Sequence, residues 1–345
     1  MKTIDLRSDT FTLPTDEMIE AIINAHKTGR LGDDVHGEDE VVIELQEKAA
    51  KILGMEAALL VSSGTQGNLI SLFAQTNRGD EIVVEDRSHT FVFEGGSMAS
   101  MGGLYPKPVK GERGYILPET LEAALSPDDA HYARTSMVVV ENTHNYAGGA
   151  VIRPEQVKAL ASMAHDYELK VHCDGARLFN AAVALDIPAK KLLEGVDSVQ
   201  ICLSKGLSAP IGSIVAGTEE FIYEAHRTRK KLGGGMRQAG IIAAPGIVAL
   251  EKMVDRLKND HENAKLLYEG IKKIPNLDTE EPDTNIIFLG LQNLSIDSMK
   301  LSEELAKEKI KVFGGYGDRT RMVLNRMVDR EDVERVVSVL KRLLK

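Results

Sequence analysis

The sequence predicts an α/β fold, in which a large, mostly parallel β-sheet is followed by a smaller α+β unit. From about residue 40 to residue 216, short apolar runs alternate with amphipathic stretches, which is typical of buried parallel strands joined by helices. Beyond residue 217 the pattern changes to long helical stretches and then to short mixed elements. A boundary near residue 250 therefore predicts a large domain, residues 1–250 with an N-terminal arm, and a small C-terminal domain, residues 251–345.

The expected elements follow in chain order. Six apolar runs predict strands of the large sheet: AALLVSS (57–63), EIVVE (81–85), SMVVVEN (136–142), KVHCD (170–174), SVQICLS (198–204) and GSIVAG (212–217). Between them lie helices such as PEQVKALASMAHDYE (154–168), which has proline in its first turn. The later helical patterns are 218–231 and 241–274, and the small unit is predicted from TNIIFLGL (284–291), SMKLSEELAKEKI (298–310), TRMVLNR (320–326) and EDVERVVSVLKRLLK (331–345).

Composition narrows the class of function. The formal net charge is −10, from 42 basic and 52 acidic residues, whereas nucleic acids and anionic membranes favour basic surfaces. The chain shows neither an apolar leader nor an apolar run long enough to span a membrane, so we expect a cytoplasmic protein that binds a small molecule. Cys173 and Cys202 have no CxxC partner and are expected to be buried and reduced. The nine histidines show no metal-binding spacing, so no metal site is predicted.

The segment SSGTQGN, residues 62–68, follows one predicted strand and opens a helix. Gly64, Thr65 and Gly67 would expose backbone N–H groups at a helix N-terminus, where the helix dipole favours a phosphate. Neither a Walker sequence nor GxGxxG is present, so an ordinary turn between strand and helix is the alternative.

Four further candidates, Asp174, Arg177, Lys205 and His89, lie at or shortly after the ends of predicted strands. Asp174 ends KVHCD, and Arg177 follows within the next turn; the alternative is a helix cap with a solvated arginine. Lys205 follows SVQICLS and is either an ordinary surface charge or a nucleophile that forms a Schiff base. A phosphate cradle, a carboxylate for a ring nitrogen and a lysine for an aldehyde together indicate pyridoxal 5′-phosphate. His89 follows EIVVE and is either structural or placed to stack on that ring or move protons.

Several motifs in this order resemble the threonine aldolases. They are DLRSDT (5–10), GDDVHGED (32–39), SSGTQGN, SHTFVFEGG (88–96), HYARTSMVVVENTHN (131–145), HCDGARLFN (172–180), ICLSKGLSAPIGS (201–213), RKKLGGGMRQAG (229–240) and TRMVLNR. The resemblance implies a fold-type I pyridoxal phosphate enzyme of the aspartate aminotransferase fold, with a seven-stranded type of sheet. It also implies a lyase that splits L-threonine or L-allo-threonine into glycine and acetaldehyde by a retro-aldol reaction.

The same resemblance assigns roles to matching residues. Lys205 would hold the cofactor and Asp174 its pyridine nitrogen. His89 would stack on the ring, and Gly64 and Thr65 would hold the phosphate. Arg177 is assigned to the cofactor as well as to the substrate. Ser8, Arg177 and Arg321 would bind the substrate carboxylate. His131 would line the side of the site that holds the substrate hydroxyl.

Lys230 and Arg237 resemble residues that reach the cofactor phosphate of a neighbouring subunit. The resemblance therefore implies a homo-oligomer, at least a dimer, and we expect a tetramer.

His89 and His131 are both candidates for the general base. Two rivals remain open: another fold-type I enzyme, such as a β-eliminating lyase or an aminotransferase, and a non-catalytic α/β protein that binds a phosphorylated metabolite. The choice among threonine, allo-threonine and bulkier substrates also remains open.

Overall fold

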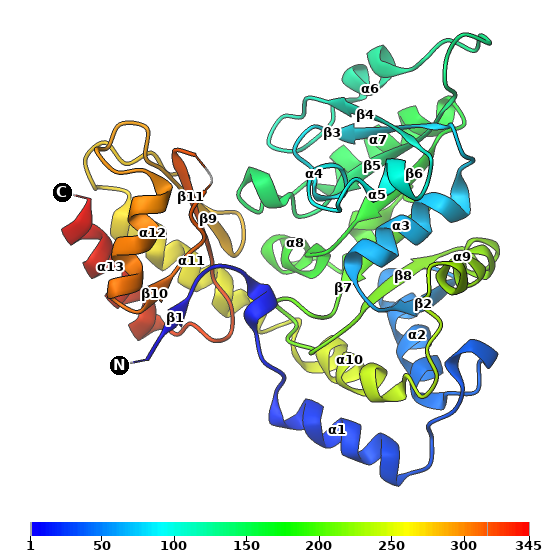
Figure 1. Ribbon diagram of the computed structural model, residues 1–345, viewed down its shortest axis with the longest axis horizontal. Helices are drawn as coiled ribbons and strands as arrows, with labels where there is room; N and C mark the ends of the chain where they lie inside the picture. Colours follow the sequence, from blue (N-terminus) through cyan, green and yellow to red (C-terminus); the bar gives the residue numbers. More distant parts are fainter. Residues whose placement is uncertain (1, 316, 345) are drawn as a thin grey trace.

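The computed structural model describes residues 2–315 and 317–344, which form a larger and a smaller lobe (Figure 1). The larger lobe is built on a seven-stranded sheet with the strand order β2-β8-β7-β6-β5-β3-β4. Its strands are β2 (Ala57–Val61), β3 (Glu81–Glu85), β4 (Tyr105–Val109), β5 (Thr135–Glu141), β6 (Lys170–Asp174), β7 (Ser198–Cys202) and β8 (Ser213–Gly217). All neighbours pair in parallel except β8, which is antiparallel to both β2 and β7. The predicted α/β class with a mostly parallel sheet is confirmed.

Helices cover the sheet because its strands are apolar on both faces. The central strands β7 and β8 are buried at every position, and the main hydrophobic core joins their side chains to those of surrounding helices. The larger lobe contains α2 (Glu40–Leu53), α3 (Gly64–Gln75), α4 (His89–Val92), α5 (Ser97–Ser100), α6 (Pro118–Ala124), α7 (Pro154–Asp166), α8 (Leu178–Leu185) and α9 (Glu219–Lys231). The chain also forms the short 3₁₀ helices η1 (Asp9–Phe11), η2 (Asp34–His36), η3 (Asn145–Ala147) and η4 (Ala189–Leu193).

The edge strand β4 was not among the predicted strands. Its sequence YPKPV contains Pro106 and Pro108, which have no N–H to donate to a neighbour. The structure accommodates them because β4 lies at the end of the sheet and pairs with β3 alone.

The smaller lobe combines both ends of the chain (Figure 1). It contains α11 (Leu257–Ile271), β9 (Ile286–Gly290), α12 (Ser298–Lys307), β10 (Ile310–Lys311), β11 (Arg319–Val323) and α13 (Arg330–Leu343). Strand β9 pairs antiparallel with β11, while the N-terminal strand β1 (Ile4–Asp5) pairs in parallel with β10. Ile4 and Leu6 are consequently buried in the core of this lobe, and the chain then crosses to the larger lobe.

The helical pattern over residues 241–274 forms two helices, α10 (Gly240–Lys252) and α11. Helix α1 (Asp16–Lys27) lies beside α10 at the base of the larger lobe (Figure 1). Leu257 at the start of α11 packs in the main core, whereas Ala264 and Leu267 pack in the core of the smaller lobe. The division at residue 250 stays a prediction, and we propose that α11 carries the chain between the domains. Over the described part of the chain, no helix combines the length and apolar character needed to cross a membrane.

Candidate active site

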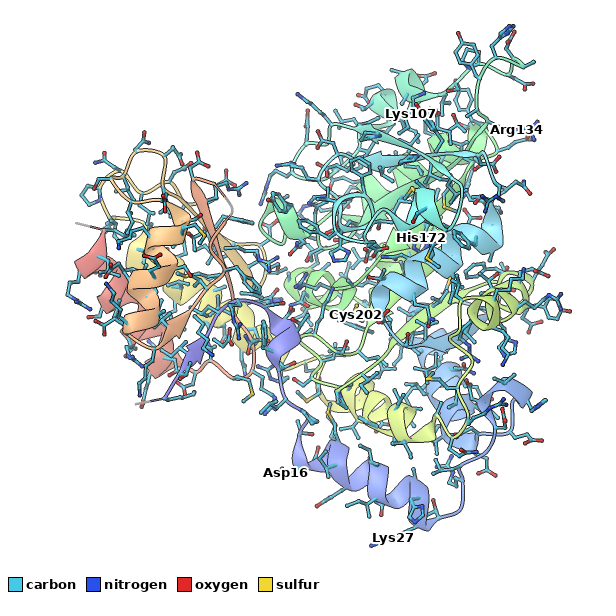
Figure 2. All side chains as sticks on the ribbon, viewed as in Figure 1. Asp16, Lys27, Lys107, Arg134, His172 and Cys202 are labelled. Carbon is cyan, nitrogen blue, oxygen red and sulfur yellow. The ribbon has the colours of Figure 1, made fainter. Side chains whose placement is uncertain are left out.

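Three functional segments meet at one edge of the large sheet. Strands β6 and β7 are parallel, and β2 runs in the same direction because β8 is antiparallel to both β7 and β2. Their carboxyl ends therefore lie together, which is where open α/β sheets bind ligands. This edge carries the start of α3 after β2, Asp174 at the end of β6 and Lys205 shortly after β7. Figure 2 labels His172 on β6 and Cys202 at the end of β7 in the middle of the larger lobe.

The start of α3 presents backbone donors at this edge. Ser63 caps the helix, since its hydroxyl accepts the N–H of Gln66 at 3.2 Å. The N–H groups of Gly64 and Thr65 belong to the first turn and have no partner within the helix. Across residues 2–315 and 317–344, no acceptor is bonded to either group. This arrangement suits a phosphate, as the sequence predicted.

Two glycines bring α3 against β7. A Cβ at Gly64 would come within 2.9 Å of Cys202 Sγ, and a Cβ at Gly67 would come within 2.6 Å of Gln200 Cγ. Both distances are shorter than ordinary Cβ contacts, so a side chain at either position would force Cys202 or Gln200 to move. The helix N-terminus is thereby held beside the strand that leads to Lys205.

Asp174 is the buried carboxylate of the site, with 1 % of its surface exposed. Its Oδ2 accepts from Asn68 Nδ2 at 2.9 Å and from the Thr90 hydroxyl at 3.3 Å, while Oδ1 accepts from the backbone N–H of Ala176 at 3.1 Å. Burial acts to raise the pKa of Asp174, but the charges of His89 and Lys205 and the Asn68 bond outweigh it and lower the pKa. The carboxylate is therefore ionised, as the partner of a protonated ring nitrogen should be.

His89 begins α4 and lies beside Asp174. Its Nδ1 is 3.1 Å from Glu94 Oε1, and its backbone N–H donates to Glu141. Burial acts to lower the pKa of His89, yet the hydrogen bond to Glu94 and the charge of Asp174 raise it above the usual range. Ligand-type atoms of His89, Glu94 and Asp174 all lie within 4.8 Å of one another. Asn68 donates to both carboxylates, which favours a hydrogen-bonded cluster, and the absence of a metal site stays a prediction.

Lys205 is half-buried in the turn that follows β7. Its carbonyl accepts from the Thr12 hydroxyl and from the N–H of Ser208, both at 2.8 Å, so the N-terminal arm and the turn hold its backbone. Ser208 adopts a left-handed conformation with φ of 66°, which closes the turn. The Lys205 charge contributes to lowering the pKa of Asp174 and that of Asp9, which places its amino group within electrostatic reach of both.

The predicted carboxylate-binding residues gather around Asp9, which is fully buried. Arg177 binds it through two bonds, Nε to Oδ2 at 2.8 Å and Nη2 to Oδ1 at 2.7 Å, and Ser8 Oγ lies 3.4 Å from Oδ1. Burial acts to raise the pKa of Asp9, but Arg177 and more weakly Lys205 and Arg321 lower it to about 2. Arg321 donates to Asn145 Oδ1 at 2.6 Å and to the carbonyl of Arg7 at 3.1 Å.

Three predicted residues lie elsewhere on the chain. His131 is in the loop between α6 and β5, with 88 % of its side chain exposed and its Nδ1 bonded to Asp129. Figure 2 shows Arg134, three residues further, at the outer edge of the larger lobe. Lys230 and Arg237 are exposed near the turn between α9 and α10, where Arg237 pairs with Asp33 at 2.7 Å. In the described residues, no bond joins any of the three to Lys205 or Asp174.

Sequence reasoning missed Asp9, Asn68 and Glu94. Asp9 stands next to Ser8, and Glu94 stands five residues after His89, so each was close to a predicted site residue. These residues could have been predicted from the sequence, because each is an acidic or amide side chain inside a segment already assigned to the site. Their partners, however, are distant in sequence and became evident only from the fold.

The donor set fits pyridoxal phosphate. It offers N–H groups at the start of α3, which have no acceptor among the described residues, for the phosphate. It also offers a buried ionised carboxylate for the ring nitrogen and a half-buried lysine for the aldehyde. Gly206, which follows Lys205, packs closely against α11, since a Cβ at Gly206 would come within 2.8 Å of Leu257 Cδ2.

Comparison with known proteins agrees with this geometry. The beta-eliminating lyase family pattern matches residues 5–293. Low-specificity L-threonine aldolase 1 of Arabidopsis thaliana is 40 % identical, covering 100 % of this chain and 97 % of its own length. The low specificity L-threonine aldolase of Escherichia coli strain K12 is 42 % identical, covering 83 % of this chain and 84 % of its own.

Solved structures share the fold. A threonine aldolase from Leishmania major superposes with a TM-score of 0.85 at 17 % identity, covering 99 % of this chain and 100 % of that one. A Thermus thermophilus aspartate aminotransferase double mutant gives 0.77 at 18 % identity, covering 99 % and 92 %. The predicted aspartate aminotransferase fold is thus confirmed, and the sequence relationship shows that the chain belongs to the beta-eliminating lyase family and, within it, to the threonine aldolases.

Proposed function

We propose that this chain is a pyridoxal phosphate-dependent carbon–carbon lyase that cleaves L-threonine and L-allo-threonine into glycine and acetaldehyde. The observation that carries the proposal is the full-length relationship to a low-specificity L-threonine aldolase at 40 % identity. The site supports it, because the buried Asp174 carboxylate, Lys205 and the start of α3 share one edge of the sheet.

Four contacts would hold the cofactor. Lys205 would bind the aldehyde carbon covalently, Asp174 would accept from the ring nitrogen, His89 would lie against the ring, and the N–H groups of Gly64 and Thr65 would bind the phosphate. When bound, pyridoxal phosphate draws into its ring the electron pair left on the amino acid by bond cleavage. Asp174 assists because its lowered pKa keeps it negative beside a positive ring nitrogen.

Ser8, Arg177 and Arg321 would orient the substrate through its carboxylate. An arginine has five N–H donors, and the bonds of Arg177 to Asp9 use Nε and Nη2, so Nη1 remains for the substrate. Asp9 keeps the Arg177 guanidinium fixed before the substrate arrives. By fixing the carboxylate, these residues would orient the substrate so that its Cα–Cβ bond is the one that breaks.

The reaction also needs a base for the substrate hydroxyl. Removing the hydroxyl proton lets the oxygen form the aldehyde carbonyl as the Cα–Cβ bond breaks, and the glycine half then takes up a proton at Cα. His89 Nε2 is one candidate, since Nδ1 faces Glu94. His131, or a water held by either histidine, is the other. His131 would act from a neighbouring copy, because it is exposed and precedes β5, whereas Lys205 follows the parallel strand β7 at the opposite edge of the sheet.

We also propose a homo-oligomer, at least a dimer and most simply a tetramer. Lys230 and Arg237 are exposed and would reach the phosphate of a neighbouring copy. Apolar side chains exposed near α1 and α10 support an interface there, namely Leu13, Ile19, Ile23, Ile211 and Ile241.

The buried free thiols of Cys173 and Cys202 are compatible with the reducing cytoplasm, which we propose as the location.

Product analysis tests the proposed function. Purified protein supplied with pyridoxal phosphate should convert L-threonine into equal amounts of glycine and acetaldehyde. The family description also fits an eliminating lyase, which would release ammonia and an oxo acid without glycine. Ammonia with an oxo acid, or amino-group transfer to a second substrate, would contradict the aldolase assignment.

A further inference from the structure

A buried chain of hydrogen bonds runs behind the candidate site. Gln75 Nε2 lies 2.7 Å from Ser198 Oγ, which lies 2.8 Å from His172 Nδ1. His172 Nε2 lies 3.1 Å from Asn68 Oδ1. Asn68 then uses both N–H bonds of its amide, one to Asp174 Oδ2 at 2.9 Å and one to Glu94 Oε1 at 2.8 Å.

Chemistry fixes the direction of every bond in this chain. Two carboxylates accept from Asn68, so its Nδ2 must face them and its Oδ1 must face His172. His172 must therefore carry its proton on Nε2 and accept from the Ser198 hydroxyl at Nδ1. Burial lowers the pKa of His172 to about 4, so the ring is neutral at neutral pH, as this arrangement requires. All donors then point toward Asp174 and Glu94, and bonds aligned in this way strengthen one another.

Glu94 connects this chain to His89. The same oxygen, Oε1, that accepts from Asn68 lies 3.1 Å from His89 Nδ1. Burial and the charge of Asp174 raise the pKa of Glu94, against the lowering effect of its bonds to His89 and Asn68. Because Oε1 already accepts from Asn68, it also accepts from His89, which places a proton on Nδ1 and leaves Nε2 as the nitrogen available to the site. Glu94 is 7 % exposed and Asn68 is 1 % exposed, so solvent does not compete for these bonds.

We propose that Glu94 is a positioning residue for the reaction: held by Asn68, it sets the tautomer and proton affinity of His89 and couples them to Asp174. The inference rests on the proposed function, because His89 is assigned to the cofactor ring there. The charged groups facing His89 are Glu94, Asp174, Lys205 and Glu141. Of these, Glu94 is the carboxylate that bonds to the imidazole ring itself.

The variant Glu94→Gln tests the inference because it removes the charge and keeps the shape. In holoenzyme labelled with ¹³C at histidine Cε1, the His89 signal is identified by its loss in His89→Gln and followed against pH. The His89 midpoint should fall in Glu94→Gln, because the partner that raises its pKa is gone. Partners that orient metal-bound histidines typically contribute about 10- to 100-fold in activity, and by analogy kcat should fall by about that factor with KM less affected. Glu94→Asp, which keeps the charge, should restore part of both.

Glu85→Gln is the matched control. Glu85 is 2 % exposed and bonds to His144 Nε2 at 2.9 Å, so the variant removes a buried glutamate from a histidine that is not His89. It should move the His144 midpoint and leave that of His89 in place. If Glu94→Gln does not fold, Asn68→Ala provides the second test, and it should lower the His89 midpoint by weakening the ionised form of Glu94.

The results separate the two claims. An unchanged His89 midpoint in the folded variant, or a midpoint that moves equally in Glu85→Gln, overturns the positioning role. A wild-type protein that forms no glycine from threonine overturns the proposed function instead, and it leaves the measured coupling of Glu94 to His89 intact.

Discussion

Asp9 shows how one buried charge organises the substrate side of the site. It lies in the N-terminal arm, is 0 % exposed and holds Arg177 by two bonds from a position 168 residues away in the sequence. Its pKa is lowered from 3.8 to about 2, so it contributes stability that is complete above pH 3.8. That contribution is lost as the pH falls through about 2, because protonation breaks the ion pair.

Asp9→Asn should therefore destabilise the protein at neutral pH, because Arg177 would remain buried without its partner. A broken buried pair typically costs about 3–5 kcal/mol of unfolding free energy, which denaturant titration can measure. As the pH falls from 3.8 to about 2, the unfolding free energy of the wild type should decrease through protonation of Asp9, and this decrease should be missing in the variant. Glu17→Gln is the control, since Glu17 pairs with Lys252 in an exposed ion pair that contributes about 0–1 kcal/mol. Equal effects of the two variants would contradict the role of Asp9.

The sequence predicted single site residues better than their partners. Asp174 and Lys205 were found because each follows an apolar strand, and strand ends are visible in the sequence. Glu94 and Asn68 were missed because their roles depend on a contact between α3 and the segment after β3. The predicted roles of the site residues themselves stay proposals.

At the scale of elements, α3 and β7 form the rigid part of the candidate phosphate site. Gly67→Ala would place a Cβ within 2.6 Å of Gln200 Cγ, and such overpacking typically costs about 1–3 kcal/mol. We expect a lower unfolding free energy and weaker retention of pyridoxal phosphate, measured by denaturant titration and by dialysis followed by cofactor absorbance.

A double-mutant cycle isolates this contact. Gln200→Ala removes the obstructing side chain, so Gly67→Ala should cost less in the Gln200→Ala background than in wild type. The same cost in both backgrounds would show that the close approach of α3 to β7 does not depend on Gly67.

Elements with a clear period were predictable, and those set by tertiary context were not. The strands EIVVE and KVHCD have the predicted bounds because their interior positions are buried, and all of these are apolar except His172. Strand β4 was missed because two prolines argue against a strand, and only its place at the sheet edge permits them. The helical pattern over 241–274 could not show the break between α10 and α11, because amphipathic residues continue across it.

At the scale of the whole molecule, we propose that the site is shared between copies. A mixture of two inactive variants tests this directly: Lys205→Ala and Arg237→Ala, refolded or co-expressed together. In a mixed dimer one site would combine Lys205 of one copy with Arg237 of the other, so the mixture should regain about one quarter of wild-type activity. The control is the double variant Lys205→Ala/Arg237→Ala expressed alone, in which no site can combine an intact Lys205 with an intact Arg237. No recovery in a mixture shown by light scattering to contain mixed oligomers would contradict the shared site.

The division into two domains stays a prediction, and the path of the chain could not be predicted from the sequence. The change of pattern after residue 217 indicated a second unit, whereas nothing in MKTIDLRSD indicated that Ile4 and Leu6 pack against the C-terminal lobe. Pairing of β1 with β10 joins the two ends of the chain across more than three hundred residues. Such contacts arise from topology, which local sequence does not encode.

The central claim is that Lys205 holds pyridoxal phosphate for threonine cleavage. Borohydride reduction of the holoenzyme, followed by proteolysis and mass mapping of the modified peptide, tests it most directly. We predict that the reduced cofactor is attached to Lys205, that reduction abolishes glycine formation, and that Lys205→Ala carries no attached cofactor. A cofactor attached to another lysine, or full activity in Lys205→Ala, would contradict the assignment.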